Sequence, residues 1–344
     1  MPSLKEIKGR INSISSTLAI TSAMKMVAAA KLQKAQMAIQ NMLPYERRLH
    51  SMLIDLMGAV NMSAPASEEG SARLVSLSNQ PDQTESEGAY SLMAQREVRK
   101  VAIVAFASNS SLCGAFNSNV IREATAVINE YRASGLGDAD ITVYSVGRKM
   151  AEAMKKLGFP SPADFTKMSD SPSYDAASAL AQELLDGFVS GRFDKVELVY
   201  NHSKSTSSQP TIRQTYLPLS LADATADLQA GKIADSASES DTNRGAEPVG
   251  APVVRQGSPT TEDLIVEPSK EELIATLLPK VVRLRVFTTL LDSTAAEQAA
   301  RTVAMQLATD NGNDLLQELT LEYNKGRQQK ITSEILDLVG GSMQ

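Results

Sequence analysis

The sequence contains very little cysteine, histidine or aromatic side chain. Of its 344 residues one is cysteine, two are histidine and none is tryptophan, and aromatic residues make up 4%. A single cysteine, Cys113, excludes a disulfide or a thiol switch within the chain. Histidine and cysteine also form no cluster with ligand spacing, so we expect no metal site. Because Ala, Leu, Ile and Met supply most of the apolar residues, the composition favours slim helix packing over a bulky aromatic core.

Long apolar runs are also missing. No segment approaches the roughly 18 to 20 apolar residues that a membrane-spanning helix needs. The first residues, Met1 to Glu6, include neither an apolar h-region nor an Arg- and Ser-rich presequence, so we expect no export or organelle signal. Direct insertion into a membrane is therefore not expected, and any membrane association is expected to go through partner proteins.

Positive charge is not in excess. The net charge is −6 and the isoelectric point is near 5.2, which argues against a nucleic-acid binder, because such proteins need basic surface to displace counterions from phosphates. Phosphate-binding glycine motifs are absent as well: there is no GxxxxGK[ST], and the segment 108–117 has a single glycine. We expect no nucleotide site and no cofactor, and we interpret Cys113 as a buried structural cysteine.

The first forty residues have the pattern of a long helix. Ser3 and Glu6 form a capping box, and from Leu4 to Met42 there is one glycine and no proline. Steps of three and four residues define a heptad seam, in which ten of twelve positions are apolar. The seam would extend about 57 Å at 1.5 Å per residue, so it needs a partner of similar length. Its positions are Leu4, Ile7, Ile11, Ile14, Leu18, Thr21, Lys25, Ala28, Leu32, Ala35, Ile39 and Met42.

The C-terminal residues supply a matching helix. No proline occurs from Val281 to Val339, and apolar residues recur at helical spacing, with an apparent slip of phase near 310–314 that predicts a local change of coil winding. Alanine is concentrated in both helices, and small side chains allow two helix axes to approach closely. We expect the helices to meet at Ala28, Ala29, Ala30, Ala35, Ala295, Ala296, Ala299, Ala300 and Ala304.

A different pattern occupies the middle of the chain. Short β-rich runs at 101–106, 141–146 and 195–200 alternate with helical stretches at about 117–133 and 173–189, and 211–217 is expected to add an edge strand. Such alternation predicts a Rossmann-like α/β domain with a mostly parallel sheet. The predicted fold class is thus α/β plus a long antiparallel coiled coil. The expected segments are 1–62 (N-terminal helix), 63–98 (acidic, Ser-rich), 99–219 (α/β domain), 220–266 (polar and flexible) and 267–344 (C-terminal helix).

Four separated motifs, in order, resemble those of the gamma subunit of F-type ATP synthases over nearly the whole chain. The motifs are Ile20 to Leu32, Leu112 to Asn117, Ser208 to Ile212, and the C-terminal run from Glu297 through 308–312 to 321–328 and 331–332. The resemblance implies a non-catalytic central-stalk rotor, with the paired helices inside a ring of three alpha and three beta subunits. It also implies an epsilon subunit and a membrane c-ring as partners, on the cytoplasmic face of a bacterial inner membrane.

By the same resemblance, two groups of residues are expected to contact the head. Beta-subunit loops would grip Met24, Lys25, Met26, Arg327 and Gln328. A hydrophobic sleeve would hold Ile335, Leu336, Leu338 and Val339. Many gamma sequences are shorter than this chain, so the segments near 63–95 and 222–262 are unusual for the family and their role is open.

The basic N-terminal helix is either an ordinary solvated face or an electrostatic track for acidic partner loops.

Two interpretations of the whole chain compete with the rotor. The whole chain could instead be a coiled-coil adaptor or spacer with an unrelated α/β module, or an enzyme that uses the α/β layer. The adaptor accounts for the heptads and leaves the four ordered motifs unexplained.

Overall fold

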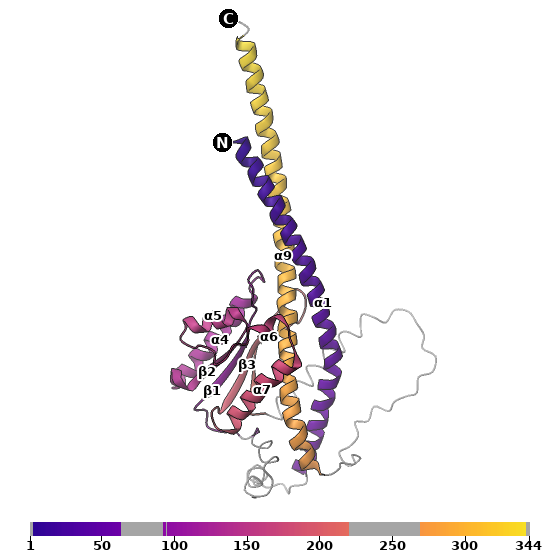
Figure 1. Cartoon of the computed structure of the whole chain (residues 1–344), viewed down its shortest axis with the longest axis vertical. Helices are drawn as coiled ribbons and strands as arrows, with labels where there is room; N and C mark the ends of the chain where they lie inside the picture. Colours follow the sequence, from indigo (N-terminus) through magenta and orange to yellow (C-terminus); the bar gives the residue numbers. More distant parts are fainter. Residues whose placement is uncertain (1–2, 63–91, 94, 220–268, 342–344) are drawn as a thin grey trace, which may run out of the picture.

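Two long helices and one α/β unit make up the molecule. The computed structural model describes residues 3–62, 92–93, 95–219 and 269–341. Helix α1 (Leu4–Met62) and helix α9 (Lys270–Gly341) lie side by side and antiparallel, and we refer to the pair as the shaft. The α/β unit, residues 95–219, packs against the lower half of the shaft and is called the foot (Figure 1). Nearly all of the segments 63–98 and 220–266 lies outside the described residues.

The heptad seam of α1 is confirmed by burial. All twelve predicted positions are buried or half-buried, whereas the residues between them are mostly exposed. Contacts across the seam fix the register: Leu4 lies against Gly326, Leu18 lies against Gly312, and the Thr309 hydroxyl is 3.2 Å from that of Thr21. At the start of α1 the backbone amide of Glu6 donates to the Ser3 hydroxyl over 3.2 Å, as the capping box predicts.

The predicted slip of phase in α9 is wrong. From 305 to 326 the less exposed residues follow steps of four and three without interruption, and the apolar Leu307 lies off this seam and is 57% exposed. The seam continues through Thr309 and Gly312, which both face α1. Neither residue is apolar, so a pattern of apolar residues alone does not detect the seam there. The seam residues are Met305, Thr309, Gly312, Leu316, Leu319, Tyr323 and Gly326.

Only some of the predicted alanines lie between the helices. The contact is made by Leu32 and Ala35 against Ala295 and Ala299, and Ala28 is also buried. Ala29 and Ala30 are exposed, and Ala296 and Ala300 pack on the foot instead of on α1. A helix turns about 100° per residue, so neighbouring alanines cannot all face one partner.

The foot is a four-stranded sheet with helices on both faces. Its strands are β1 (Val101–Phe106), β2 (Ile141–Val146), β3 (Lys195–Asn201) and β4 (Thr211–Leu217). The order is β2-β1-β3-β4; β1 is parallel to β2 and β3, and β4 is antiparallel at one edge. The predicted strand positions and the mostly parallel sheet are thus confirmed.

Alternate residues of β1 face the two layers. Val101, Ile103 and Ala105 pack against α4 (Phe116–Ala133) and α5 (Arg148–Lys156). Ala102, Val104 and Phe106 face α7 (Tyr174–Val189) and the shaft, with the short helix α6 (Thr166–Asp170) alongside. Helices α4 and α7 were predicted, and α5, α6 and the 3₁₀ turn Asp138–Asp140 were not. In the described part of the chain, no helix has the length and hydropathy to cross a bilayer.

Candidate functional site

The residues expected to contact a catalytic head lie at two separate levels of the shaft. Lys25 is half-buried in the seam and Met24 is half-buried beside it, whereas Met26 points outward with 65% of its surface exposed. Arg327 and Gln328 are exposed. Since Thr21 lies opposite Thr309, Lys25 lies opposite residue 305, one turn further along. Residue 327 is then about 33 Å away along the axis, so the two groups do not form one site.

The tip of α9 extends past its partner. Leu4, at the start of α1, already lies at Gly326, so residues 327–341 continue without α1 beside them, as Figure 1 shows. Four apolar residues near the end of this tip are 52% to 74% exposed. They are Ile335, Leu336, Leu338 and Val339, the four residues expected to run in a hydrophobic sleeve. The tip therefore has an apolar surface that the described part of the chain leaves exposed.

Where the foot meets the shaft, α9 is enclosed on all sides. Every residue from 295 to 301 is buried. Ala295 and Ala299 face α1, while Ala296 and Ala300 contact Cys113 and Phe116 of the foot. A helix buried all round needs small apolar residues, which explains the alanines that the seam does not use.

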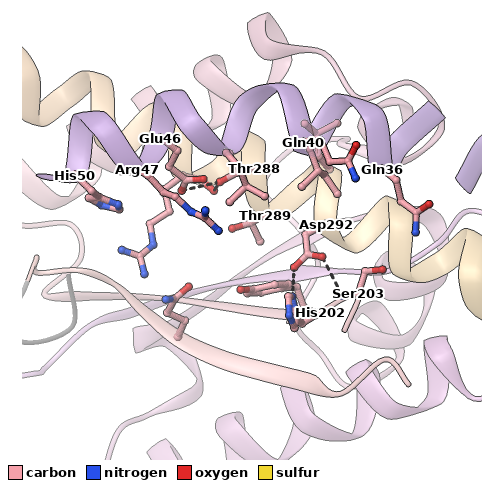
Figure 2. A pocket seen from close by; sticks show the side chains of 16 residues that line it. Gln36, Gln40, Glu46, Arg47, His50, His202, Ser203, Thr288, Thr289 and Asp292 are labelled. Atoms are coloured by element: carbon pink, nitrogen blue, oxygen red, sulfur yellow. Dashed lines mark hydrogen bonds and ion pairs between the residues drawn. The ribbon is translucent and has the colours of Figure 1, made fainter. Parts of the chain in front are cut away.

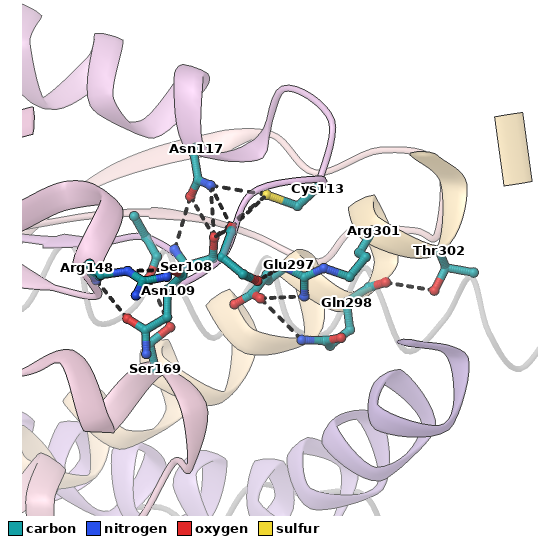
Figure 3. A network of polar contacts seen from close by, with 12 residues as sticks. Ser108, Asn109, Cys113, Asn117, Arg148, Ser169, Glu297, Gln298, Arg301 and Thr302 are labelled. Atoms are coloured by element: carbon teal, nitrogen blue, oxygen red, sulfur yellow. Dashed lines mark hydrogen bonds and ion pairs between the residues drawn. The ribbon is translucent and has the colours of Figure 1, made fainter. Parts of the chain in front are cut away.

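An ion pair lies inside this enclosure. Arg301 donates to Glu297 over 2.6 Å and to the Ser110 hydroxyl over 2.7 Å, and the Glu297 and Arg301 side chains are each 9% exposed (Figure 3). Burial raises the pKa of Glu297, and the neighbouring Arg301 opposes that rise. The pair has the i, i+4 spacing of a helical ion pair, so sequence alone could have suggested it.

The loop that carries Ser110 is itself held by hydrogen bonds. The Asn117 amide oxygen accepts from the Ser108 backbone amide over 3.0 Å, and the Asn117 amide nitrogen lies 3.2 Å from Cys113 Sγ (Figure 3). Cys113 is 1% exposed, as expected of a structural cysteine. Leu112 has a positive φ of 68°, a conformation rare for a bulky residue, and its side chain is 60% exposed.

A second polar contact joins foot and shaft on another side of α9. His202 and Ser203 begin the hairpin between β3 and β4, and both bind Asp292: the His202 Nδ1 to Asp292 Oδ2 distance is 2.6 Å, and the Ser203 amide donates to Oδ1 over 2.9 Å (Figure 2). The Asp292 hydrogen bond and charge raise the pKa of His202, against the effect of burial. Sequence reasoning missed this contact, because its partners are 90 residues apart.

Beside this contact is a cavity of about 510 Å³ between α1, α9 and the β3–β4 edge of the sheet. Polar side chains line much of it, among them Gln36, Gln40, Arg47, Thr289 and Asp292 (Figure 2). The cavity belongs to the junction between foot and shaft.

A buried carboxylate stabilises the opposite face of the foot. Glu197 on β3, with a side chain 2% exposed, accepts from Arg213 Nε over 2.7 Å and from the Tyr131 hydroxyl over 2.7 Å, and Lys195 Nζ lies 2.7 Å away. Burial raises the pKa of Glu197, but these hydrogen bonds outweigh it and hold the pKa below its ordinary value. The polar groups of this cluster bond to one another, which indicates a structural role for the cluster.

Among the described residues, no group of three or more metal-ligating side chains is found. The polar groups at the junction pair with each other across packed elements, and the tip of the shaft has exposed apolar groups. The arrangement can transmit a turning force between the foot and the tip.

Comparison with known proteins agrees with this description. The sequence profile of a family described as ATP synthase matches residues 3–343. Proteins named ATP synthase gamma chain are 48% identical over 343 residues in Phocaeicola vulgatus and 47% identical over 344 residues in Bacteroides thetaiotaomicron. Each alignment covers 100% of both chains, so chains of this length recur among these relatives.

Solved structures share the fold. A chain in the cryo-EM structure of Euglena gracilis mitochondrial ATP synthase (OSCP/F1/c-ring, rotational state 3) matches with a TM-score of 0.54 and 20% identity, covering 99% of this chain and 93% of that one. A chain in the rotor of the same enzyme in rotational state 1 gives a TM-score of 0.51 and 19% identity, with coverage of 95% and 98%. The full-length profile match and the full-length relatives establish that this chain belongs to the ATP synthase gamma-chain family, the non-catalytic central-stalk subunits of F-type ATP synthase.

Proposed function

We propose that this chain is the torque-transmitting rotor shaft between a proton-driven membrane ring and a catalytic head. The observation that carries the proposal is the tip of α9, residues 327–341, which continues past α1 with exposed apolar side chains. Such a surface is costly in water and calls for an enclosing partner. A rod that ends in an apolar tip fits a bearing at the centre of a ring.

The partners follow from the relatives. The matched Euglena chain belongs to an assembly of F1 and a c-ring. We therefore assign this chain three alpha and three beta subunits around the shaft, an epsilon subunit, and a membrane c-ring below the foot. The relatives compared are bacterial, so the complex would lie on the cytoplasmic face of the inner membrane, with this chain as a peripheral subunit.

Beta-subunit loops would grip the shaft at two levels, about 33 Å apart. The lower level comprises Met24, Lys25 and Met26, and the upper level comprises Arg327 and Gln328. Arg327 suits this role because a guanidinium binds carboxylates in a bidentate manner and releases them without losing its charge.

Rotation would act on the catalytic sites through asymmetry. Around the shaft, α1 and α9 present different side chains, so each beta subunit meets a different surface at a given angle. A ligand-binding equilibrium shifts only by the difference in contact energy between its states. Turning the shaft changes those contacts in sequence and thereby changes the nucleotide affinity of each beta subunit.

Reconstitution tests the proposal. The complex is assembled in vesicles from alpha, beta and epsilon subunits and the membrane sector, with and without this chain, and ATP-driven proton uptake is measured. Uptake is expected only when the chain is present, and the purified chain alone is expected to hydrolyse no ATP. Proton uptake without the chain, or ATP hydrolysis by the chain alone, would refute the proposal.

A further inference from the structure

We propose that Asp292 is a positioning residue that fixes the rotational position of the foot on the shaft. This inference rests on the function proposed above. We call the contact of Asp292 with His202 and Ser203 the clasp. Its two hydrogen bonds, 2.6 Å and 2.9 Å long, engage both carboxylate oxygens, and one donor is a backbone amide (Figure 2). A backbone donor fixes the main chain of the hairpin itself, which a contact between two long side chains does not do.

The clasp lies on one side of α9, and two side-chain contacts with the foot lie on the opposite side. Arg283 donates to the Gln182 side chain of α7 over 2.6 Å, and Arg301 donates to Ser110 over 2.7 Å. Each arginine is nine residues from Asp292, about two and a half turns at 3.6 residues per turn. The foot therefore holds α9 from two opposite sides, and the clasp is a polar contact on one of them.

A direct path leads from the clasp into the sheet. His202 follows β3 directly, and its backbone amide donates to Pro210 O over 2.8 Å, which closes the hairpin. The preceding residue, Asn201, is fully buried; its side chain donates to Phe116 O over 3.0 Å and accepts from Thr211 over 2.6 Å. A force on Asp292 thus reaches β3, β4 and α4 through hydrogen bonds, without a long flexible side chain in between.

Without the clasp, the foot would still be held by the two arginine contacts on the opposite side of α9, by the hydrogen bond from the Tyr216 hydroxyl to Val282 O, and by apolar packing. Apolar packing is non-directional and resists sliding less than it resists separation. We therefore expect loss of the clasp to leave the foot folded and attached and to let it twist more easily about α9. Each proton-driven step would then twist the junction further before it turns the shaft.

The test uses Asp292→Ala, Asp292→Asn and His202→Ala in the full reconstituted complex. Asp292→Asn keeps an acceptor for the Ser203 amide and a partner for His202. Asp292→Ala removes both hydrogen bonds of the clasp, and His202→Ala removes one. Asp138→Ala is the matched control, because Asp138 also accepts two hydrogen bonds, 2.6 Å and 2.9 Å long, from Arg132 within the foot. With the head fixed and a probe on the foot, the angular fluctuation of the probe measures the twist.

We expect the angular variance to increase in Asp292→Ala, to increase less in His202→Ala, and to match wild type in Asp292→Asn and Asp138→Ala. Hydrogen exchange of the Ser203 amide is expected to accelerate by about tenfold in Asp292→Ala, as for the loss of a bond to a charged acceptor. ATP hydrolysis by the head stays at the wild-type rate, and the number of protons moved per ATP is unchanged, because the foot and the shaft are one chain and complete each turn together.

The outcomes separate the two proposals. If the wild-type complex does not pump, the proposed rotor function fails. If it pumps and Asp292→Ala has wild-type angular variance, the clasp has no positioning role. If Asp292→Ala unfolds the foot, the angular variance of His202→Ala decides instead. A wild-type angular variance in His202→Ala would overturn the inference.

Discussion

The side chain of Leu18 occupies the space where a side chain on Gly312 would be. A β-carbon on Gly312 would lie 2.7 Å from Leu18 Cδ2 and 3.1 Å from Leu18 Cγ. Glycine in a helix interior costs about 1 kcal/mol relative to alanine, so its presence in α9 needs a reason. The reason is close packing: the seam of α1 presents a leucine here, and α9 makes room by having no side chain.

Replacing Gly312 by Ala tests this packing. Helix propensity alone predicts a gain of about 1 kcal/mol, but Leu18 would have to move as a whole, and overpacking costs about 1–3 kcal/mol. The matched control is Gly9→Ala in α1, where nothing lies within 4 Å of the added carbon. Thermal unfolding of the helical signal is expected to shift upward in the Gly9 variant and not in the Gly312 variant. Equal upward shifts would contradict the packing argument.

Much of the architecture could be predicted because it follows local periodicity. The seam from Leu4 to Met42 repeats every seven residues, and the central strands are continuous apolar runs, so both patterns appear in the sequence itself. The phase of α9 was misjudged because Thr309 and Gly312 are not apolar, although both face α1. Helix α5 was missed, being only nine residues long, too short to give a strong periodic signal.

The junction between foot and shaft could not be predicted in the same way. Asp292 and His202 are 90 residues apart, and Arg301 and Ser110 are 191 residues apart, so no local spacing pairs them. Each is an ordinary polar residue in its own segment. Their meeting depends on how the sheet packs on α9, which is a property of the tertiary fold. The expected head-contact residues stay predictions, since their partners belong to other chains.

The upper grip level can be tested at Arg327. Arg327→Ala is expected to weaken coupled turnover by about tenfold, because a hydrogen bond to a charged partner contributes about 1.5–3 kcal/mol. The foot should remain folded, since Arg327 is exposed and far from it. Arg122→Ala on α4 is a suitable control, its closest described polar partner being Asn119 at 3.4 Å. Normal coupled turnover with Arg327→Ala in the assembled enzyme would show that the proposed grip is wrong.

The buried carboxylate of the foot leads to a stability prediction. Glu197→Ala leaves Arg213 and Lys195 beside an apolar gap, and removing one partner of a buried pair costs about 3 kcal/mol or more. Glu152→Ala is the control, because Glu152 is half-exposed and its ion pairs with Arg148 and Lys149 lie at the surface. Denaturant unfolding, followed by exchange of the β1 amides, should be destabilised in the first variant and nearly unchanged in the second. Similar small effects would mean that the cluster contributes little.

The strength of the clasp should depend on pH, because His202 titrates. The native pKa of His202 is raised above its ordinary value of 6.5 chiefly by the hydrogen bond to Asp292. A group whose native pKa is raised stabilises the fold fully below its unfolded pKa, and that contribution is lost as pH rises through the native pKa. We therefore expect the clasp to weaken from about pH 6.5 upward. The histidine is 44% exposed on its side chain, so solvent screening keeps the effect on global stability small.

Proton NMR can measure this titration directly, because the chain has only two histidines. Asp292→Asn is expected to lower the pKa of His202. Lys204, the nearest charge on the hairpin, lowers the pKa of His202 and remains in the variant, as do the charged residues of α1 and α9 that line the cavity. The difference between the two chains therefore isolates Asp292. An unchanged His202 titration would mean that the 2.6 Å contact does not persist in solution.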